Sequence, residues 1–162
     1  MQVAIITGAG SGIGLATARM LHDMGMAVVG VGRDPAKLNA LQQTIGDPGR
    51  LAALAVDITA KDAPKRIVDQ ALERYGRIDF LVNNAGIGSP KPLHETDDET
   101  LDHFLDIMLR APFRLAREVI THMQAGSGIV NVTSTFAMIG GKRGGAYSAA
   151  KFAIAGWTDA LH

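Results

Sequence analysis

Short, almost uninterrupted hydrophobic runs alternate along this chain with longer segments whose apolar residues recur every three or four positions. The short runs are typical of strands, and their near-continuous hydrophobicity indicates burial on both faces, as in a parallel sheet. The predicted strands are 3–7, 27–31, 51–56, 78–83 and 128–133. The amphipathic segments predict helices near 12–24, 35–45, 61–75 and 97–123, and a last helix from about 146.

The alternation of strand and helix predicts an α/β fold: a Rossmann-like, doubly wound parallel sheet with helices on both faces. Asp34 stands before Pro35, which puts a capping carboxylate ahead of a proline in the first helical turn. Thr96 and Glu99 have the spacing of a capping box. No repeat or linker interrupts the pattern, so we expect residues 1–162 to form a single domain.

The composition narrows the classes of function. Sixteen lysines and arginines balance 16 aspartates and glutamates, so no net charge favours binding to nucleic acid or an anionic membrane. The lack of cysteine excludes disulfides, thiolate metal sites and a cysteine nucleophile. The five histidines show no metal-ligand spacing, and we interpret them as solvated surface residues rather than a metal site. No signal-like or membrane-spanning run is present, which predicts a cytoplasmic protein.

A glycine-rich turn, TGAGSGIG at 7–14, joins the first predicted strand to the first helix. Its glycines let the backbone approach a pyrophosphate, whose charge then meets free N–H groups and the positive end of the helix dipole. The spacing differs from the G-x-G-x-x-G of many dinucleotide binders and from the P-loop. A tight structural turn is the alternative, but the position inside a β–α–β unit favours the nucleotide interpretation.

Three further motifs follow in order: NNAG at 83–86, Ser134 at the end of a predicted strand, and Tyr147 four residues before Lys151. Together with the glycine turn, they resemble the classical short-chain dehydrogenase/reductase family over essentially the whole chain. The resemblance implies that 1–162 is one dinucleotide-binding and catalytic domain of an oxidoreductase. Taken singly, each motif also has a purely structural interpretation, as an Asn-Gly turn, a loop serine or an exposed Tyr–Lys pair.

The resemblance also implies a set of cofactor contacts. The glycine turn would line the pyrophosphate, Asp57 and Ile58 would meet the adenine, and the NNAG segment would meet the ribose on the nicotinamide side. Tyr147 and Lys151 would complete the set. The other implied residues are Gly8, Ser11, Gly12, Ile13, Gly14, Asn84, Ala85 and Gly86. These positions follow predicted strands, where open α/β sheets bind their ligands.

The end of the second predicted strand bears on the choice of cofactor. An NAD enzyme of this type needs a carboxylate there for the ribose hydroxyls, but the sequence has Gly32 followed by Arg33. Glycine leaves room for a 2′-phosphate, and a guanidinium can bind it through two hydrogen bonds. We therefore predict NADP(H) as the preferred cofactor. NAD(H) remains the alternative because Asp34 is only one residue further on, although we expect Asp34 to cap the next helix.

Ser134, Tyr147 and Lys151 are the predicted catalytic residues. The cofactor would supply the hydride, Ser134 would hold the carbonyl oxygen, and Tyr147 would donate or accept the proton. An ammonium one helical turn from a phenol favours the phenolate, which suits Lys151 to assist Tyr147. The predicted substrate is a small carbonyl or alcohol. A nucleotide-binding module without turnover is the alternative.

One position departs from the family. Met108 stands where the resemblance implies an asparagine that organises a proton-relay water. Because Pro112 has no N–H, the carbonyl of Met108 lacks its usual helical donor. We therefore expect a kinked helix near 108–112 and a weakened relay that survives on this carbonyl.

By the resemblance, the chain stops before the family's C-terminal strands and substrate lid. We therefore expect a 162-residue product to bind NADP(H) weakly, to turn over little and to associate through an exposed fifth strand. The resemblance also implies a homo-oligomer, a dimer or tetramer, paired through the helices at 97–123 and from 146. Phe113, Phe152 and Trp157 would line either that interface or a core face.

Overall fold

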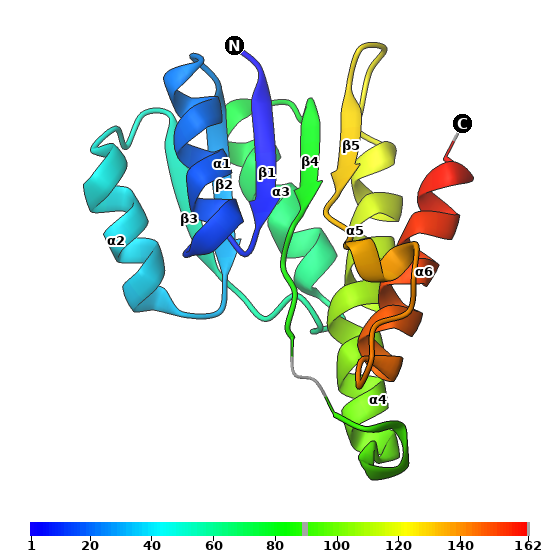
Figure 1. Ribbon diagram of the computed structural model, residues 1–162. Helices are drawn as coiled ribbons and strands as arrows, with labels where there is room; N and C mark the ends of the chain where they lie inside the picture. The colour runs from blue at the N-terminus through cyan, green and yellow to red at the C-terminus, as the bar shows by residue number, and fades with distance from the viewer. Residues whose placement is uncertain (89–90, 162) are drawn as a thin grey trace.

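The computed structural model describes residues 1–88 and 91–161. In this part of the chain, the core is a sheet of five parallel strands in the order β3-β2-β1-β4-β5 (Figure 1). The strands are β1 (Val3–Thr7), β2 (Ala27–Gly32), β3 (Leu51–Ala55), β4 (Phe80–Asn83) and β5 (Gly128–Asn131). The chain builds outward from β1 first on one side and then on the other. This doubly wound α/β arrangement confirms the predicted fold class.

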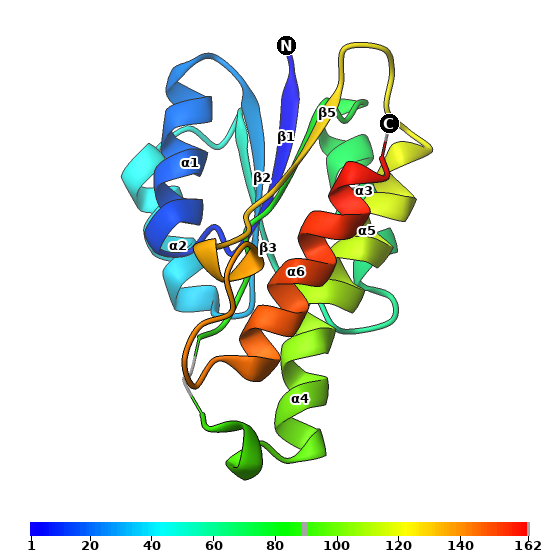
Figure 2. The ribbon, with the colours of Figure 1, turned by 45° about the vertical axis from the view of Figure 1, so that its right-hand side comes forward.

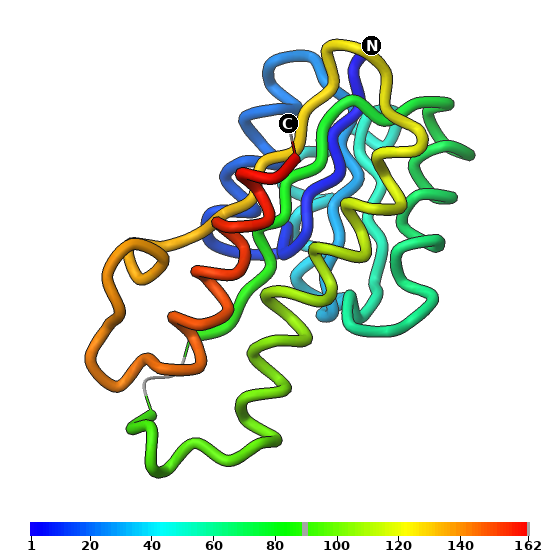
Figure 3. Tube along the Cα trace, turned by 90° about the vertical axis from the view of Figure 1, so that its right-hand side faces the viewer, coloured from blue at the N-terminus to red at the C-terminus, as the bar shows by residue number. Residues whose placement is uncertain are grey.

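Helices cover both faces of the sheet. They are α1 (Gly12–Asp23), α2 (Pro35–Ile45), α3 (Ala63–Tyr75), α4 (Asp98–Leu105), α5 (Ala111–Ile120) and α6 (Gly145–Asp159). Figure 2 shows α1 and α2 on one face, with α3 and α5 on the other. The helix α6 lies beside the rod formed by α4 and α5, as Figures 1 and 3 both show.

Alternate residues of β1 supply two apolar layers, because successive side chains of a strand point to opposite faces. Ile5 packs into the layer that contains Ile67 of α3 and Leu115 of α5. Ile6 packs into the opposite layer with Leu38 of α2. Every residue of β1 is buried, as its unbroken apolar sequence predicts for a central parallel strand.

The start of α2 confirms the predicted cap. The Oδ1 of Asp34 accepts hydrogen bonds from the backbone N–H groups of Ala36 and Lys37, at 2.9 and 3.4 Å. The capping box predicted at Thr96 and Glu99 is wrong. The residue that caps α4 is Asp97, whose carboxylate accepts from Thr100 N–H at 2.8 Å.

The cause of this error lies in the turn before α4. The hydroxyl of Thr96 donates to the carbonyl of Pro92 at 2.9 Å, within the 3-10 turn η1 (Leu93–Glu95). This hydroxyl is therefore committed one residue before the cap position, and the neighbouring carboxylate of Asp97 caps the helix.

The irregularity expected near 108–112 is present as a π-helical turn, η2 (Asp106–Arg110), between α4 and α5. The hydrogen bond that defines this π-turn runs from the N–H of Ala111 to the carbonyl of Asp106, five residues earlier. Pro112 follows in the first turn of α5, where its missing N–H is tolerated. The extra residue of a π-turn is a frequent feature of functional sites.

The surface interpretation of the histidines is wrong for His22. It is buried in the last turn of α1, with its Nε2 3.2 Å from Oδ2 of Asp47 in the turn before β3. Residues 1–88 and 91–161 hold no cluster of three or more potential metal-ligating side chains. In the same residues, no helix has the length and apolar character needed to cross a bilayer.

Candidate active site

The glycine turn after β1 depends on close contacts that only glycine allows. Gly8 and Gly12 have φ values of 69° and 52°, in the left-handed region. A Cβ at Gly14 would overlap the carbonyl oxygen of Gly8. A Cβ at Gly8 would lie 2.9 Å from Nδ2 of Asn84. The turn is therefore packed directly against the end of β4, and its open side faces the carboxyl edge of the sheet.

Thr7 joins this turn to the NNAG segment. Its hydroxyl oxygen accepts hydrogen bonds from the backbone N–H groups of Asn84 and Ala85, both at 3.0 Å. In return, the side-chain amide of Asn84 donates to the carbonyl of Thr7 at 2.9 Å. Thr7 was not among the site residues predicted from the sequence, although it is the one polar residue of β1. The amide of Asn84 thus ties two strand ends together.

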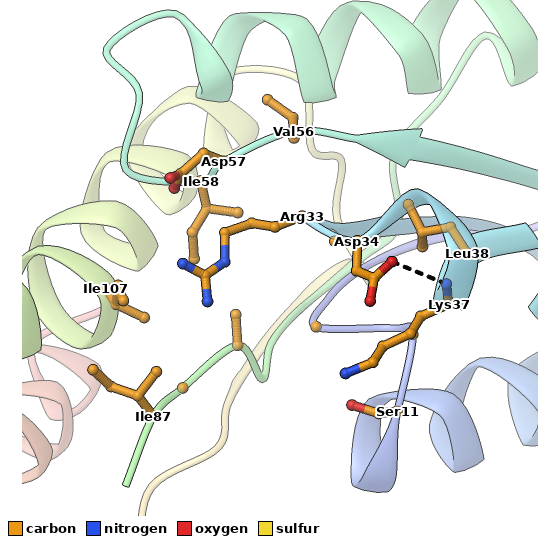
Figure 4. Close-up of a pocket in the computed structure, with 15 residues that line it drawn as sticks. Ser11, Arg33, Asp34, Lys37, Leu38, Val56, Asp57, Ile58, Ile87 and Ile107 are labelled. Carbon is orange, nitrogen blue, oxygen red and sulfur yellow. Dashed lines mark hydrogen bonds between the residues drawn. The ribbon is translucent and has the colours of Figure 1, made fainter. Parts of the chain in front are cut away.

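A pocket at the carboxyl edge of the sheet gathers most of the predicted cofactor residues (Figure 4). The predicted residues that line it are Gly8, Ser11, Arg33, Asp57, Ile58, Ala85 and Gly86. Ile13, Asn84, Tyr147 and Lys151 line a neighbouring pocket. Gly12 and Gly14 line neither pocket and act by shaping the turn. The two pockets share Gly86 and Ile87, so they form one groove.

Asp57 lies at one end of this groove, just after β3. Its Oδ1 accepts hydrogen bonds from the N–H and the hydroxyl of Thr59, at 2.9 and 2.8 Å. The Thr59 groups, together with the nearby guanidinium of Arg33, hold the pKa of Asp57 below its ordinary value. Asp57 is therefore ionised at neutral pH, and one of its two carboxylate oxygens accepts hydrogen bonds from Thr59 of the same loop.

Tyr147 and Lys151 meet at the other end of the groove, on the first two turns of α6. The Nζ of Lys151 lies 5.8 Å from the centre of the Tyr147 ring. It donates to the carbonyl of Val132 at 2.7 Å, and only 5% of Lys151 is exposed. Burial lowers the pKa of Lys151. The i, i+4 spacing read from the sequence therefore places a desolvated ammonium beside the phenol ring.

Ser134 follows β5, as predicted, but it does not line either pocket of the groove. Its Oγ accepts from the N–H of Phe136 at 3.2 Å and caps the 3-10 turn η3 (Thr135–Ala137). Its neighbour Thr133 lines the pocket that holds Tyr147 and donates to the carbonyl of Lys151 at 3.3 Å. The structure thus brings Tyr147 and Lys151 together but directs the Ser134 oxygen to its own turn.

Two aromatic rings fix the orientation of Tyr147. Phe136 and Phe104 contact its ring edge to face, with centroids 5.8 and 6.4 Å away. Phe136 is seated in turn on Gly141, where any Cβ would overlap its ring. Gly141 and Gly144 therefore make room for Phe136, a packing role that was not predicted from the sequence.

Met108 completes the wall beside Lys151. Its side chain is fully buried and lines the pocket with Tyr147. A Cβ at Gly86 would lie 3.6 Å from Sδ of Met108 and 3.9 Å from Nζ of Lys151. The thioether of Met108 and the ammonium of Lys151 therefore both lie against Gly86, where the resemblance implied an amide in place of the thioether. The use of the Met108 carbonyl as a water site stays a prediction.

Comparisons with known proteins agree with this geometry. A family model described as short chain dehydrogenase matches residues 2–162. The cis-4-hydroxycyclohexanecarboxylate dehydrogenase of Sinomonas cyclohexanicum is 39% identical over 97% of this chain. A short-chain dehydrogenase/reductase structure from Brucella melitensis superposes with a TM-score of 0.96 at 34% identity, over 99% of this chain.

A second Brucella melitensis structure, a 3-ketoacyl-(acyl-carrier-protein) reductase complexed with NADH, covers 99% of this chain with a TM-score of 0.93 at 34% identity. The match covers 68% of that structure. It covers 64% of the Sinomonas relative and 65% of the first Brucella structure. The chain therefore spans about two thirds of the length of the proteins it resembles.

Proposed function

Because this chain belongs to the short chain dehydrogenase family, we propose that it is the cofactor-binding and catalytic part of an NADP(H)-dependent oxidoreductase. The observation that carries the proposal is the single groove that joins the glycine turn and Arg33 at one end to Tyr147 and Lys151 at the other. The substrate would be a small molecule with a carbonyl group or the corresponding alcohol.

The groove has the chemistry that a nicotinamide dinucleotide requires. At Gly12, apart from its chain neighbours and its own helix, no atom of residues 1–88 or 91–161 lies within 4 Å of where a Cβ would be, so backbone at the start of α1 would be open to a phosphate. Val56 and Ile58 give apolar surface for an adenine ring, and Arg33 gives a cation. When bound, the nicotinamide would supply or accept the hydride.

Tyr147 would move the proton at the substrate oxygen through its phenol group. The packing of Phe104 and Phe136 against its ring supports this role, because a proton donor must be held in position. Lys151 would stabilise the phenolate and offer its remaining N–H groups to the cofactor ribose. Ser134 would orient the substrate oxygen by donating its hydroxyl proton, which its capping bond leaves free because Oγ is the acceptor there.

The proposed preference for NADP(H) rests on the end of β2. Gly32 provides no carboxylate for a ribose hydroxyl, and Arg33 follows it in the groove. The acid next to Arg33 in the sequence, Asp34, is engaged by the N–H groups of α2. The Brucella reductase was solved with NADH, so both coenzymes belong in any test.

Oxidation of NADPH in the presence of a panel of cyclic and linear ketones tests the proposed function. Tyr147→Phe should lower turnover by about 100-fold or more and leave NADPH binding intact, because only the proton donor is lost. Tyr75→Phe is the matched control, since Tyr75 lies in α3, away from the groove. Unchanged turnover in Tyr147→Phe would contradict the role of Tyr147, and NADPH binding without turnover of any ketone would indicate a binding module.

We also propose a homo-oligomer paired through α5 and α6. Phe113 and Phe152, one on each helix, are both 46% exposed, whereas Trp157 is partly buried and packs edge to face on Phe113 at 5.7 Å. Two large exposed aromatic rings are typical of an interface. Light scattering should give a dimer or tetramer, and a monomer would refute the pairing.

A further inference from the structure

A second cation enters the adenosine end of the groove beside Arg33. Lys37, in the first turn of α2, lines the same pocket. Figure 4 shows the two side chains reaching the pocket from different sides, with Arg33 near Asp57 and Ile58, and Lys37 near Ser11. From the sequence, Arg33 was the one residue predicted to contact the 2′-phosphate, and the chemistry proposed above makes no use of Lys37.

Packing against the glycine turn fixes the base of the Lys37 side chain. A Cβ at Gly10 would lie only 2.9 Å from the Cβ of Lys37. The first turn of α2 thus sits directly on the turn that would hold the pyrophosphate. The backbone N–H of Lys37 is held at the same time by Oδ1 of Asp34, at 3.4 Å. The backbone and Cβ of Lys37 are therefore held in place by these contacts, and the side chain extends from there into the pocket.

The ammonium of Lys37 is available to a ligand. The structure records no ion pair for Lys37 or Arg33 with any side chain in 1–88 or 91–161. In Figure 4 the carboxylate of Asp34 lies on the Lys37 side of the pocket, with one oxygen committed to its helix, and Asp57 lies near Arg33. Since the two carboxylates that line this pocket, those of Asp34 and Asp57, offset the positive charge of Arg33, one guanidinium alone would attract a phosphate weakly here. Lys37 adds a second cation and a further hydrogen-bond donor for a phosphate.

We propose that Lys37 is a second contact for the 2′-phosphate of NADP(H) and that Lys37 and Arg33 together set the preference for the phosphorylated dinucleotide. This inference rests on the proposed NADP(H) dependence. In dinucleotide-binding folds of this kind, the ribose 2′ position faces the end of β2, and Arg33 and α2 directly follow that strand. An ammonium donates to phosphate as a point charge, so it needs no planar approach.

Two nucleotide fragments isolate the contact. Adenosine 2′,5′-bisphosphate and 5′-AMP differ only in the 2′-phosphate, so their affinity ratio measures what that group contributes. Isothermal titration of both fragments requires no turnover and no substrate. It applies to the full 162-residue chain, as wild type and as Lys37→Gln, Lys37→Arg and Arg33→Gln. Lys65→Gln is the matched control, because Lys65 is an exposed lysine of α3 paired with Asp69.

In wild type, the bisphosphate should bind more tightly than 5′-AMP. Lys37→Gln should weaken the bisphosphate by about tenfold, as expected for one charge-assisted hydrogen bond, and leave 5′-AMP unchanged. It should also flatten the salt dependence of bisphosphate binding, because one cation fewer is screened. Lys37→Arg should retain most of the affinity, Arg33→Gln should resemble Lys37→Gln, and Lys65→Gln should match wild type.

The outcomes separate the two proposals. If wild type prefers the bisphosphate and Lys37→Gln keeps that preference, the role of Lys37 is overturned while the NADP(H) preference stands. If Lys37→Gln weakens both fragments equally, the lysine contacts the 5′-phosphate or only supports the fold, and the inference again fails. If wild type binds both fragments equally, the NADP(H) preference fails together with the role of Lys37.

Discussion

The two ends of the groove are built by different means. At the dinucleotide end, close contacts at the glycines and the hydrogen bonds of the Thr7 hydroxyl hold the backbone of the glycine turn against the backbone that follows β4. The strand β1 is buried along its whole length. At the catalytic end, side chains hold the site: two phenylalanines flank Tyr147, and β5 is only partly buried, with Val130 53% exposed. Changes at the first end should therefore disturb the fold, whereas changes at the second should mainly disturb the chemistry.

The largest loss of stability is expected from Gly14→Ala. The new methyl group would overlap the Gly8 carbonyl, and overpacking of this kind destabilises by about 3 kcal/mol. Gly156→Ala in α6 is the control, because in the described part of the chain no atom outside its own helix lies within 4 Å of the new methyl group, and alanine favours a helix by about 0.5–1 kcal/mol. Urea unfolding measures both. A Gly14→Ala protein as stable as wild type would show that the glycine turn is not tightly packed.

Thr7→Val should cost about 2 kcal/mol, because it removes the acceptor of two backbone N–H groups, those of Asn84 and Ala85. Thr7→Ser keeps the oxygen and should recover most of the loss. Hydrogen exchange should speed up at Asn84 and Ala85 in the valine variant only. Equal exchange in both variants would mean that the hydroxyl does not hold the NNAG segment.

Phe136→Leu examines the catalytic end. The loss of one edge-to-face contact with Tyr147 should reduce the free energy of unfolding by only about 1 kcal/mol. The effect on turnover should be larger than the effect on stability, because the phenol would lose its fixed orientation. NADPH binding should not change. A variant that loses cofactor binding and turnover to the same degree would contradict the separation of the two ends.

The smallest effects are those of pH: Asp79 and Lys151 both make stability rise with pH, but in different pH ranges. Asp79, just before β4, has its pKa lowered by Arg77 and by the N–H of Val3. Its contribution is present above the unfolded pKa of ~3.9 and is lost as pH falls through the lower folded value. Asp79→Asn should therefore flatten the acid limb of stability against pH.

Lys151 should act at alkaline pH instead, because burial lowers its pKa below the unfolded value of ~10.4. Between the folded and unfolded pKa values, the unfolded chain binds more protons, so stability rises with pH. Lys151→Met should abolish that rise. Urea unfolding from pH 8 to pH 11 measures it, and a rise that persists in Lys151→Met would assign the effect to another group.

Local patterns were enough to predict the sheet. The continuous apolar runs located all five strands, and β1 and α2 begin and end at the predicted residues. Asp34 was readable as a cap because cap and helix are adjacent in sequence. At α4 the same use of neighbouring residues predicted Thr96 as the cap, but the cap is Asp97. The Thr96 hydroxyl is already bonded to Pro92 in a turn that the sequence pattern did not predict.

The contacts that the sequence did not reveal are mostly long-range or depend on tight packing. Thr7 and Asn84 are 77 positions apart, and no pattern within a strand points from one to the other. Lys37 lies at the site because α2 packs closely against Gly10, a contact between two segments that are separate in the sequence. The predicted cofactor residues were found because the carboxyl ends of parallel strands meet at one edge, a consequence of topology alone.

A fluorescence titration of wild type and Arg33→Ala with NADPH and NADH tests the central claim most directly, namely that the groove is an NADP(H) site. With two cations available to the 2′-phosphate, NADPH should bind about 100-fold more tightly than NADH, and Arg33→Ala should reduce that ratio by about tenfold. Equal affinities in wild type, or a ratio that Arg33→Ala leaves unchanged, would contradict the account.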